Sequence, residues 1–142
     1  MSDNFDGVPA LTGTVNVLTV QDPDPTPNRV LDWDLPFSVV VSWTLDQPAT
    51  AQLLDGTWTV KVHAESQGAG FEGLVGSVPV TANGSLTYTA TIPVPAHLLD
   101  PDEDPTSGVY VLRSVITYRT VNGVLTEIAG FGSGPEILVR KP

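Results

Sequence analysis

Hydrophobic and polar residues alternate along several short stretches of the chain. The stretch 37–45 reads FSVVVSWTL, so aromatic and aliphatic residues share one face, and the other face carries mostly Ser and Thr. The stretches 57–65 and 85–92 alternate in the same way. A period of two with one apolar face is typical of antiparallel strands that have a core on one side and water on the other.

This pattern predicts a chain of short strands. We expect them over the ranges 13–20, 29–34, 37–45, 57–65, 74–81, 85–92, 109–121, 124–130 and 136–140. Thirteen prolines and thirteen glycines leave no room for a long helix, and only 95–100, PAHLLD, has room for a single helical turn.

Dipeptides that tolerate positive φ fall between the predicted strands. Asp55-Gly56, Asn83-Gly84 and Asn122-Gly123 are expected to form tight turns, and Asn122-Gly123 is expected to close a hairpin. Glycines in the segment 130–136, GFGSGPE, are expected to form a bulge or kink in the last strands.

These elements predict one all-β domain. The chain has 142 residues, enough for a single core. Regularly spaced short strands predict an antiparallel two-layer β-sandwich of about 7–9 strands. We expect this domain to span residues 1–142, with 1–12 as a flexible N-terminal arm.

Two aromatic residues connect this pattern with a known architecture. Trp43 lies on the apolar face of an early strand, where such sandwiches commonly place a buried indole. Tyr110 begins a late, long strand and resembles a tyrosine-corner residue, whose hydroxyl binds backbone just upstream. The chain therefore resembles an immunoglobulin-like or fibronectin type III-like sandwich. It departs from that pattern because it has no cysteine pair, and because the acidic segment 100–107 disturbs the spacing before Tyr110. The resemblance implies a fold and no function.

The charge of the chain narrows the classes of partner. Sixteen acidic and six basic residues give a net charge of −10, which argues against nucleic acid and against anionic membrane surfaces. The absence of cysteine excludes disulfides and thiolate metal sites. No apolar run is long enough to cross a bilayer, so we expect no membrane insertion. No signal peptide is visible, and we expect a cytoplasmic location or a place in a bacterial or viral assembly.

Two segments combine aspartates with prolines: 21–28, QDPDPTPN, and 100–108, DPDEDPTSG. Their aspartates, listed here, have the alternating spacing of some calcium ligands: Asp22, Asp24, Asp100, Asp102 and Asp104. However, the glycine and terminal glutamate of a calcium loop are missing, and proline pushes each preceding residue toward extended backbone. We interpret both segments as stiff loops between strands, with calcium binding as the alternative.

Few residues suggest catalysis. In LDWDLP, Asp32 and Asp34 flank Trp33, and alternation places both acids opposite the indole. This arrangement fits a sugar-binding or glycosidase site, or an edge strand whose outward charges discourage pairing.

The sequence gives even less support to a catalytic nucleophile or a metal site. The two histidines, His63 and His97, have no metal-binding spacing, and Ser133 lacks the strand–turn–helix context of a nucleophile. We therefore predict no catalytic, cofactor or metal residues, and a protein that is not an enzyme.

The stretch 109–118 is apolar on both faces. Tyr110 and Leu112 belong to one face, and the other face carries the residues that we predict as a candidate interface: Val109, Val111, Arg113 and Val115. A strand with two apolar faces is either covered by a further layer or contacts a partner. The alternative is that the valines of the second face serve only strand formation, which β-branched residues favour.

From these observations we predict a non-enzymatic protein-interaction or structural subunit of a larger assembly. It would bind a protein partner, or form a homo-oligomer, through strand faces or edges. The alternative is a carbohydrate- or calcium-binding immunoglobulin-like module.

Overall fold

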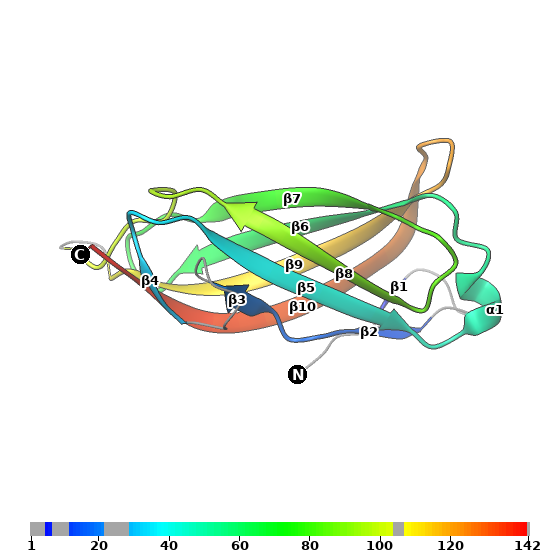
Figure 1. Cartoon of the computed structure of the whole chain (residues 1–142), viewed down its shortest axis with the longest axis horizontal. Helices are drawn as coiled ribbons and strands as arrows, with labels where there is room; N and C mark the ends of the chain where they lie inside the picture. The colour runs from blue at the N-terminus through cyan, green and yellow to red at the C-terminus, as the bar shows by residue number, and fades with distance from the viewer. Residues whose placement is uncertain (1–4, 7–11, 22–28, 104–106, 142) are drawn as a thin grey trace.

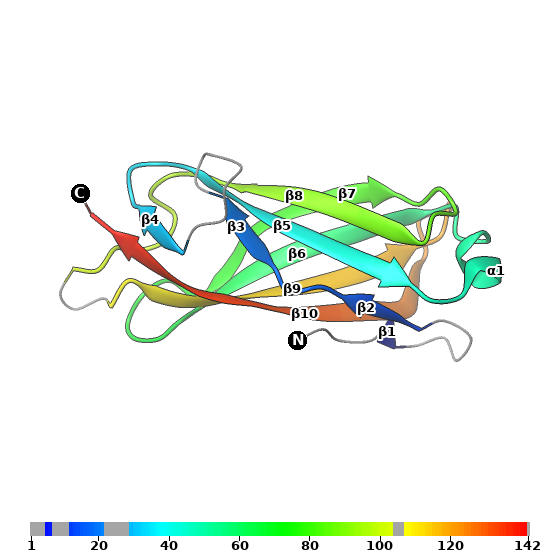
Figure 2. The ribbon, with the colours of Figure 1, turned by 60° about the horizontal axis from the view of Figure 1, so that its bottom comes forward.

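A computed structural model describes residues 5–6, 12–21, 29–103 and 107–141, and the strands in these ranges form two facing sheets (Figures 1 and 2). The larger sheet has six strands in the order β1-β10-β9-β6-β7, with β4 pairing with β10. Its strands are β1 (Phe5–Asp6), β4 (Val30–Asp32), β6 (Thr57–Ser66), β7 (Gly73–Thr81), β9 (Val109–Arg119) and β10 (Leu125–Arg140).

The smaller sheet has four strands within the described ranges. Its strands are β2 (Gly13–Val15), β3 (Thr19–Gln21), β5 (Phe37–Leu45) and β8 (Thr87–Val94). The long strand β5 pairs with all three others: with β8 along nearly its whole length, and with β2 and β3 over its two halves. The predicted all-β two-layer sandwich is confirmed.

Several predicted elements differ in detail. The range 13–20 is divided into β2 and β3, and the two ranges 124–130 and 136–140 are one strand, β10. The segment 95–100, which had room for a helical turn, forms a turn without a helix, and the short helix α1 (Pro48–Ala51) forms elsewhere, with its proline in the first turn, where a missing N–H costs nothing. Within the predicted N-terminal arm, β1 pairs antiparallel with β10, so these two residues belong to the sheet.

Aromatic rings fill the space between the sheets. Trp43 of β5, Trp58 of β6 and Tyr88 of β8 are buried, as their alternation predicts. The ring centroids of Trp43 and Tyr88 are 5.5 Å apart, and those of Trp43 and Trp58 are 5.8 Å apart. Stacked and edge-on pairs at these distances stabilise a core beyond the area that they bury.

Tyr110 makes the contact expected of a tyrosine-corner residue. Its hydroxyl donates a 2.8 Å hydrogen bond to the backbone oxygen of Asp100, ten positions upstream. The ring itself is fully buried. The bond therefore attaches the segment before β9 to the core.

The predicted turns have different outcomes. Asn122-Gly123 closes the β9–β10 hairpin as predicted, with Gly123 at φ +81°. Gly84 also has φ +81°, but the turn at Asn83 connects strands of different sheets. A tight turn at Asp55-Gly56 is wrong, because this dipeptide leads from α1 into β6. Position 56 requires glycine for another reason: a Cβ there would lie 1.9 Å from the Arg119 carbonyl oxygen.

The predicted irregularity in the last strand is confirmed. The pairing of β10 with β9 shifts register between Ser133 and Glu136. Beside this bulge, the chain between β2 and β3 reaches across to the larger sheet, where the Leu18 amide donates to the Ser133 carbonyl oxygen at 3.2 Å. This hydrogen bond joins the segment between β2 and β3 to the larger sheet.

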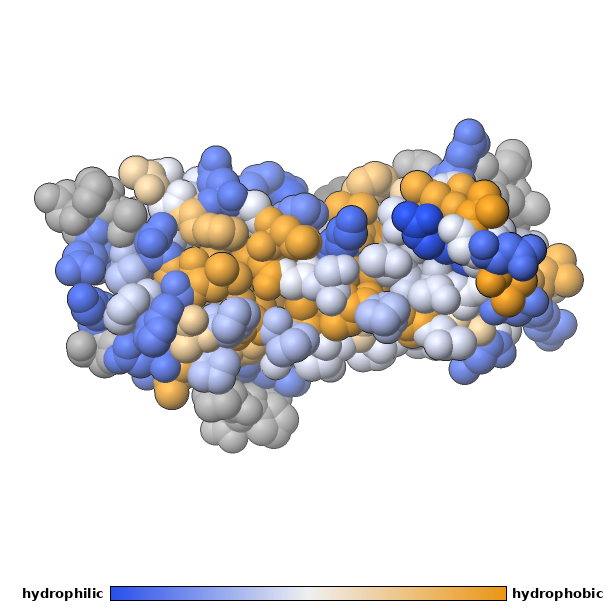
Figure 3. Space-filling view, turned by 90° about the horizontal axis from the view of Figure 1, so that it is seen from above, coloured by the Kyte–Doolittle hydropathy of each residue, from blue (hydrophilic) through white to orange (hydrophobic). Residues whose placement is uncertain are grey.

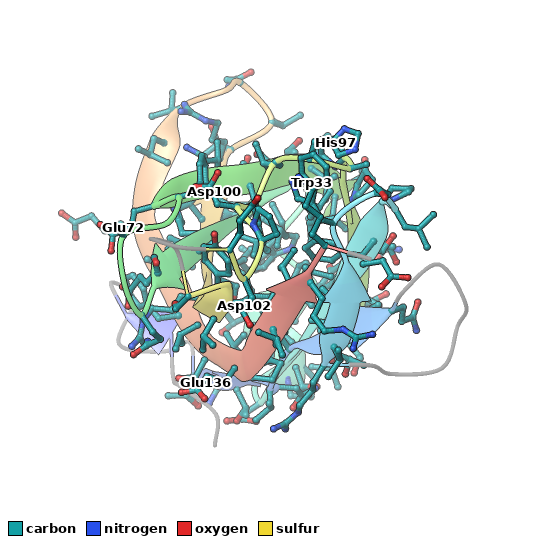
Figure 4. The ribbon with its side chains drawn as sticks, turned by 90° about the vertical axis from the view of Figure 1, so that its left-hand side faces the viewer. Trp33, Glu72, His97, Asp100, Asp102 and Glu136 are labelled. Atoms are coloured by element: carbon teal, nitrogen blue, oxygen red, sulfur yellow. The ribbon has the colours of Figure 1, made fainter. Side chains whose placement is uncertain are left out.

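Among the described strands, one pair is parallel. Val30, Leu31 and Asp32 of β4 lie opposite Leu138, Val139 and Arg140 of β10. This pairing places the residues after β4 beside those after β10, at one end of the sandwich (Figure 4). In the part of the chain that the structure describes, no helix is long and apolar enough to cross a membrane.

Candidate binding site

A shallow cleft lies at this end of the sandwich. Three segments frame it: β4 with the turn that follows, the chain at 95–99, and the end of β10. Its empty volume is about 210 Å³, including the space at its mouth. The residues that line it are Leu31, Asp32, Trp33, Leu35, Phe37, Pro95, His97, Leu98, Leu99 and Val139.

Backbone hydrogen bonds hold the three segments together. The amide of Trp33 donates to the carbonyl oxygen of Arg140 at 2.7 Å, and the amide of His97 donates to the carbonyl oxygen of Trp33 at 3.1 Å. The chain then turns away, because the Leu35 amide donates to the Asp32 carbonyl oxygen at 3.1 Å. Trp33 is therefore fixed from both sides by its own backbone.

The backbone of His97 is in the left-handed region, with φ +69°. Among the described residues other than glycine, no other has a positive φ. Such a conformation is costly for a residue with a Cβ, and it persists where the surroundings impose it, often at ligand sites. Here it directs the imidazole against Trp33, with ring centroids 4.2 Å apart (Figure 4).

Charged groups surround the indole. The Nε2 atom of His97 lies 3.3 Å from Oδ1 of Asp34. The Nζ atom of Lys141 lies over the Trp33 ring, 5.3 Å from its centroid, and 3.7 Å from Oε2 of Glu103. Each of these four charged or titratable side chains is about half exposed, so the cluster is in contact with solvent.

The arrangement corrects the interpretation of LDWDLP. The predicted strand 29–34 ends at Asp32, so Trp33 and Asp34 lie in a turn and no longer alternate across a sheet. Trp33 is partly buried against the core, and Asp34 reaches His97. Asp32 lines the cleft together with Trp33, whereas Asp34 is outside the lining and contacts His97, so the predicted placement of both acids opposite the indole does not describe this turn.

Chemically, this cleft is suited to binding. An indole offers an apolar face, the aspartates accept hydrogen bonds, and the imidazole can donate or accept according to its tautomer. A mostly apolar concavity with a few converging polar groups is the usual form of a small-ligand site.

The candidate interface occupies a different surface. Val109, Val111, Arg113 and Val115 all lie on the outer face of the larger sheet, opposite the buried Tyr110 and Leu112. The three valines are partly buried by neighbouring strands, and Nε of Arg113 lies 3.2 Å from Oε2 of Glu65. Whether this face contacts a partner stays a prediction.

The calcium alternative can be examined only in part. Asp22, Asp24 and Asp104 lie outside the described residues. Within the described ranges, no three acidic or histidine side chains gather as a metal site would require. The backbones of Asp100 and Asp102 are engaged, since Asp100 accepts from Tyr110 and the Asp102 amide donates to Val139.

The remaining candidates lie away from the cleft. His63 is in β6 beside Arg113, on the outer face of the larger sheet. Ser133 lies in the bulge of β10, where its carbonyl oxygen accepts from Leu18.

Sequence reasoning missed two contacts of Trp33: those with His97, which lines the cleft, and with Lys141. His97 is far from Trp33 in the sequence, and no local pattern indicates a histidine at positive φ. Lys141 comes to Trp33 only through the parallel pairing of β4 with β10. The proline on each side of the 95–100 segment was the one available signal of an irregular loop.

The two facing sheets and the end cleft define an all-β sandwich domain with a candidate ligand site. No protein-family model matches the chain, and no curated protein matches it. Among solved structures, it is similar to the crystal structure of the C-terminal domain of wzt, with a TM-score of 0.59 and 10% sequence identity. The similarity covers 99% of this chain and 79% of that chain, and it shows a shared fold.

Proposed function

We propose that this chain is a non-enzymatic binding domain whose ligand is a carbohydrate, bound at the Trp33 cleft. One observation carries the proposal: a tryptophan in an open cleft, flanked by Asp32 and Asp34 and touched by a histidine in a strained backbone conformation. A pyranose ring can place its C–H groups on the indole while its hydroxyls donate to the aspartates.

The size and setting of the cleft support this ligand class. The cleft is shallow and its volume includes solvent at the mouth, so a sugar ring would lie against the indole at the surface, with the rest of the chain outside. The half-exposed polar groups around it can exchange water for sugar hydroxyls at low cost. The immunoglobulin-like character that we also infer has support from the positions of Trp43 and Tyr110.

A Trp33→Ala variant tests the proposal. Screening on a glycan array would identify binders, and calorimetry would give their affinities. We expect Trp33→Ala to weaken binding at least about tenfold, because it removes the stacking surface. Trp33→Phe should retain part of the affinity, and it preserves the packing against the core.

The matched control is Phe131→Ala, since Phe131 is an aromatic side chain, 45% exposed, on β10 away from the cleft. Its affinity for the sugar should equal that of the unmodified protein. An array without any binder, or unchanged affinity in Trp33→Ala, would rule out the proposal.

A second candidate is self-association through the outer face of the larger sheet. Phe131 and Leu74 are 45% and 46% exposed there, and Phe131 lies opposite Val115 of the candidate interface. A separate hydrophobic surface is visible along the edge of the sandwich where β7 lies uppermost (Figure 3). Exposed apolar area of this kind is typical of contact surfaces.

Sedimentation velocity over a range of concentrations tests this candidate. If the face binds a second copy, a dimer should form as concentration rises, and Phe131→Ser should shift the equilibrium toward monomer. A monomer at every concentration would count against it.

A further inference from the structure

A positive charge lies over one face of the Trp33 ring, a side chain that lines the cleft. The ammonium group of Lys141 lies 5.3 Å from the centroid of the Trp33 ring and 3.7 Å from a carboxylate oxygen of Glu103. An indole ring attracts a cation placed over its face, because the ring quadrupole is negative there. The site thus combines a cation–π contact with an ion pair.

This internal contact is weak enough to exchange. The Lys141 and Glu103 side chains are 49% and 57% exposed, and at such exposure both a cation–π contact and an ion pair contribute little. Lysine also regains rotamer freedom when its head group is released. A ligand that offers its own cation can therefore take the place of the ammonium.

The charges around the cleft favour such a ligand. Three carboxylates, those of Asp32, Asp34 and Glu103, are carried by the segments that frame the cleft or contact its lysine. The basic groups nearby are Lys141, the neighbouring Arg140 and the titratable His97. Once Lys141 is displaced, negative charge predominates, in a protein whose net charge is −10. An anionic ligand would be repelled, and a cationic one attracted.

We propose that the natural ligand carries a protonated amino group, as an amino sugar does, and that Lys141 occupies the place of this group in the free protein. The inference rests on the proposed carbohydrate function and specifies its substrate class. The sugar ring stacks on Trp33, and its ammonium group pairs with Glu103.

Two oligosaccharides of equal length test the proposal: a fully deacetylated glucosamine oligomer, and its N-acetylated, neutral counterpart. Calorimetry at about pH 6 keeps the amino groups charged. We expect the charged oligomer to bind at least about tenfold tighter. Lys141→Gln should tighten its binding by about fivefold, which corresponds to the loss of an internal competitor worth about 1 kcal/mol.

Glu103→Gln should weaken binding of the charged oligomer and leave the neutral one unaffected. Glu136→Gln is the matched control, because it removes a carboxylate at the same end of the molecule, away from Trp33 and His97 (Figure 4). It should change neither affinity by as much as Glu103→Gln does.

A simple cation provides a readout that needs no sugar. Tetramethylammonium chloride, titrated into the Lys141→Gln variant, should shift the Trp33 indole N–H resonance, and sodium chloride should not.

The outcomes separate the two proposals. Equal or tighter binding of the neutral oligomer would overturn the amino-sugar inference and leave carbohydrate binding intact. A shift with tetramethylammonium, but no binding of either oligomer, would support the cation site and count against a sugar ligand. No shift with tetramethylammonium would overturn the cation site itself.

Discussion

At the scale of single residues, Tyr110 shows how one side chain serves both the core and a loop. Its ring is fully buried, and its hydroxyl donates to the backbone of Asp100. Burial raises the pKa of the Tyr110 phenol, and the nearby negative charge of Asp100 raises it further. The folded protein therefore favours the neutral phenol.

This shift predicts a loss of stability in alkali. Because the pKa of Tyr110 is higher in the folded state, its contribution is complete below about pH 10, the value for an unfolded tyrosine, and falls as pH rises above it. Tyr110→Phe should lower the free energy of unfolding by about 1 kcal/mol at neutral pH, since it removes one hydrogen bond.

Urea unfolding of both proteins from neutral pH to about pH 11 checks this prediction. The unfolding free energy should fall less steeply above about pH 10 in Tyr110→Phe. Parallel curves for the two proteins would contradict it.

The residues of the cleft show where sequence reasoning ends. Trp33 and its two aspartates form a recognisable group because they are adjacent in the chain. The imidazole of His97 and the ammonium of Lys141 reach Trp33 through tertiary contacts, which no local pattern encodes. Alternation also placed Trp33 in a strand, whereas the chain must turn after Asp32 to enter β5.

At the scale of elements, alternation predicts a strand well where one face of the strand contacts solvent and the other contacts the core. The range 37–45 was predicted with its final bounds, because its inner face is apolar at every second position. Alternation does not predict which strands pair. The sequence of a three-residue strand such as β4 does not indicate whether it pairs with β10, or whether the pairing is parallel.

The meeting of β10 with the β2–β3 segment depends on one glycine. A Cβ on Gly132 would lie 2.5 Å from Oγ of Ser114 and 2.6 Å from Cγ1 of Val15. Both neighbours are buried, so neither can move away easily. We expect Gly132→Ala to lower the unfolding free energy by about 2 kcal/mol, as overpacking in a core does.

Urea denaturation again provides the measurement. Gly123→Asn is the control: Gly123 also has no side chain, but nothing lies within 4 Å of its added Cβ, and asparagine tolerates positive φ. Equal stability of Gly132→Ala and the unmodified protein would show that the two sheets separate more readily than the contacts indicate.

At the scale of the whole molecule, negative charge is in large excess. The chain has sixteen acidic residues and six basic ones. The side chains of the ion pairs seen among the described residues are about half exposed, and such pairs contribute little: His97–Asp34, Arg113–Glu65 and Lys141–Glu103. Repulsion between carboxylates therefore remains largely unbalanced.

This imbalance predicts that salt stabilises the protein. Raising sodium chloride from about 0.01 M to about 0.15 M shortens the Debye length from about 30 Å to about 8 Å, so distant carboxylates repel each other less. We expect the melting temperature to rise over this range. Differential scanning calorimetry at fixed pH is the measurement, and a lower melting temperature in salt would show that the exposed ion pairs outweigh the repulsion.

The parallel pairing of β4 with β10 has a consequence for the lifetime of the folded end. Only three residue pairs join these strands, yet they carry Trp33 on one side and Lys141 on the other. On the proposed function, a ligand in the cleft contacts residues of both β4 and β10, so it should hold these two strands together. Saturating ligand should then slow proteases that cut the chain where β4 and β10 separate, and this protection would report occupancy of the cleft without any label.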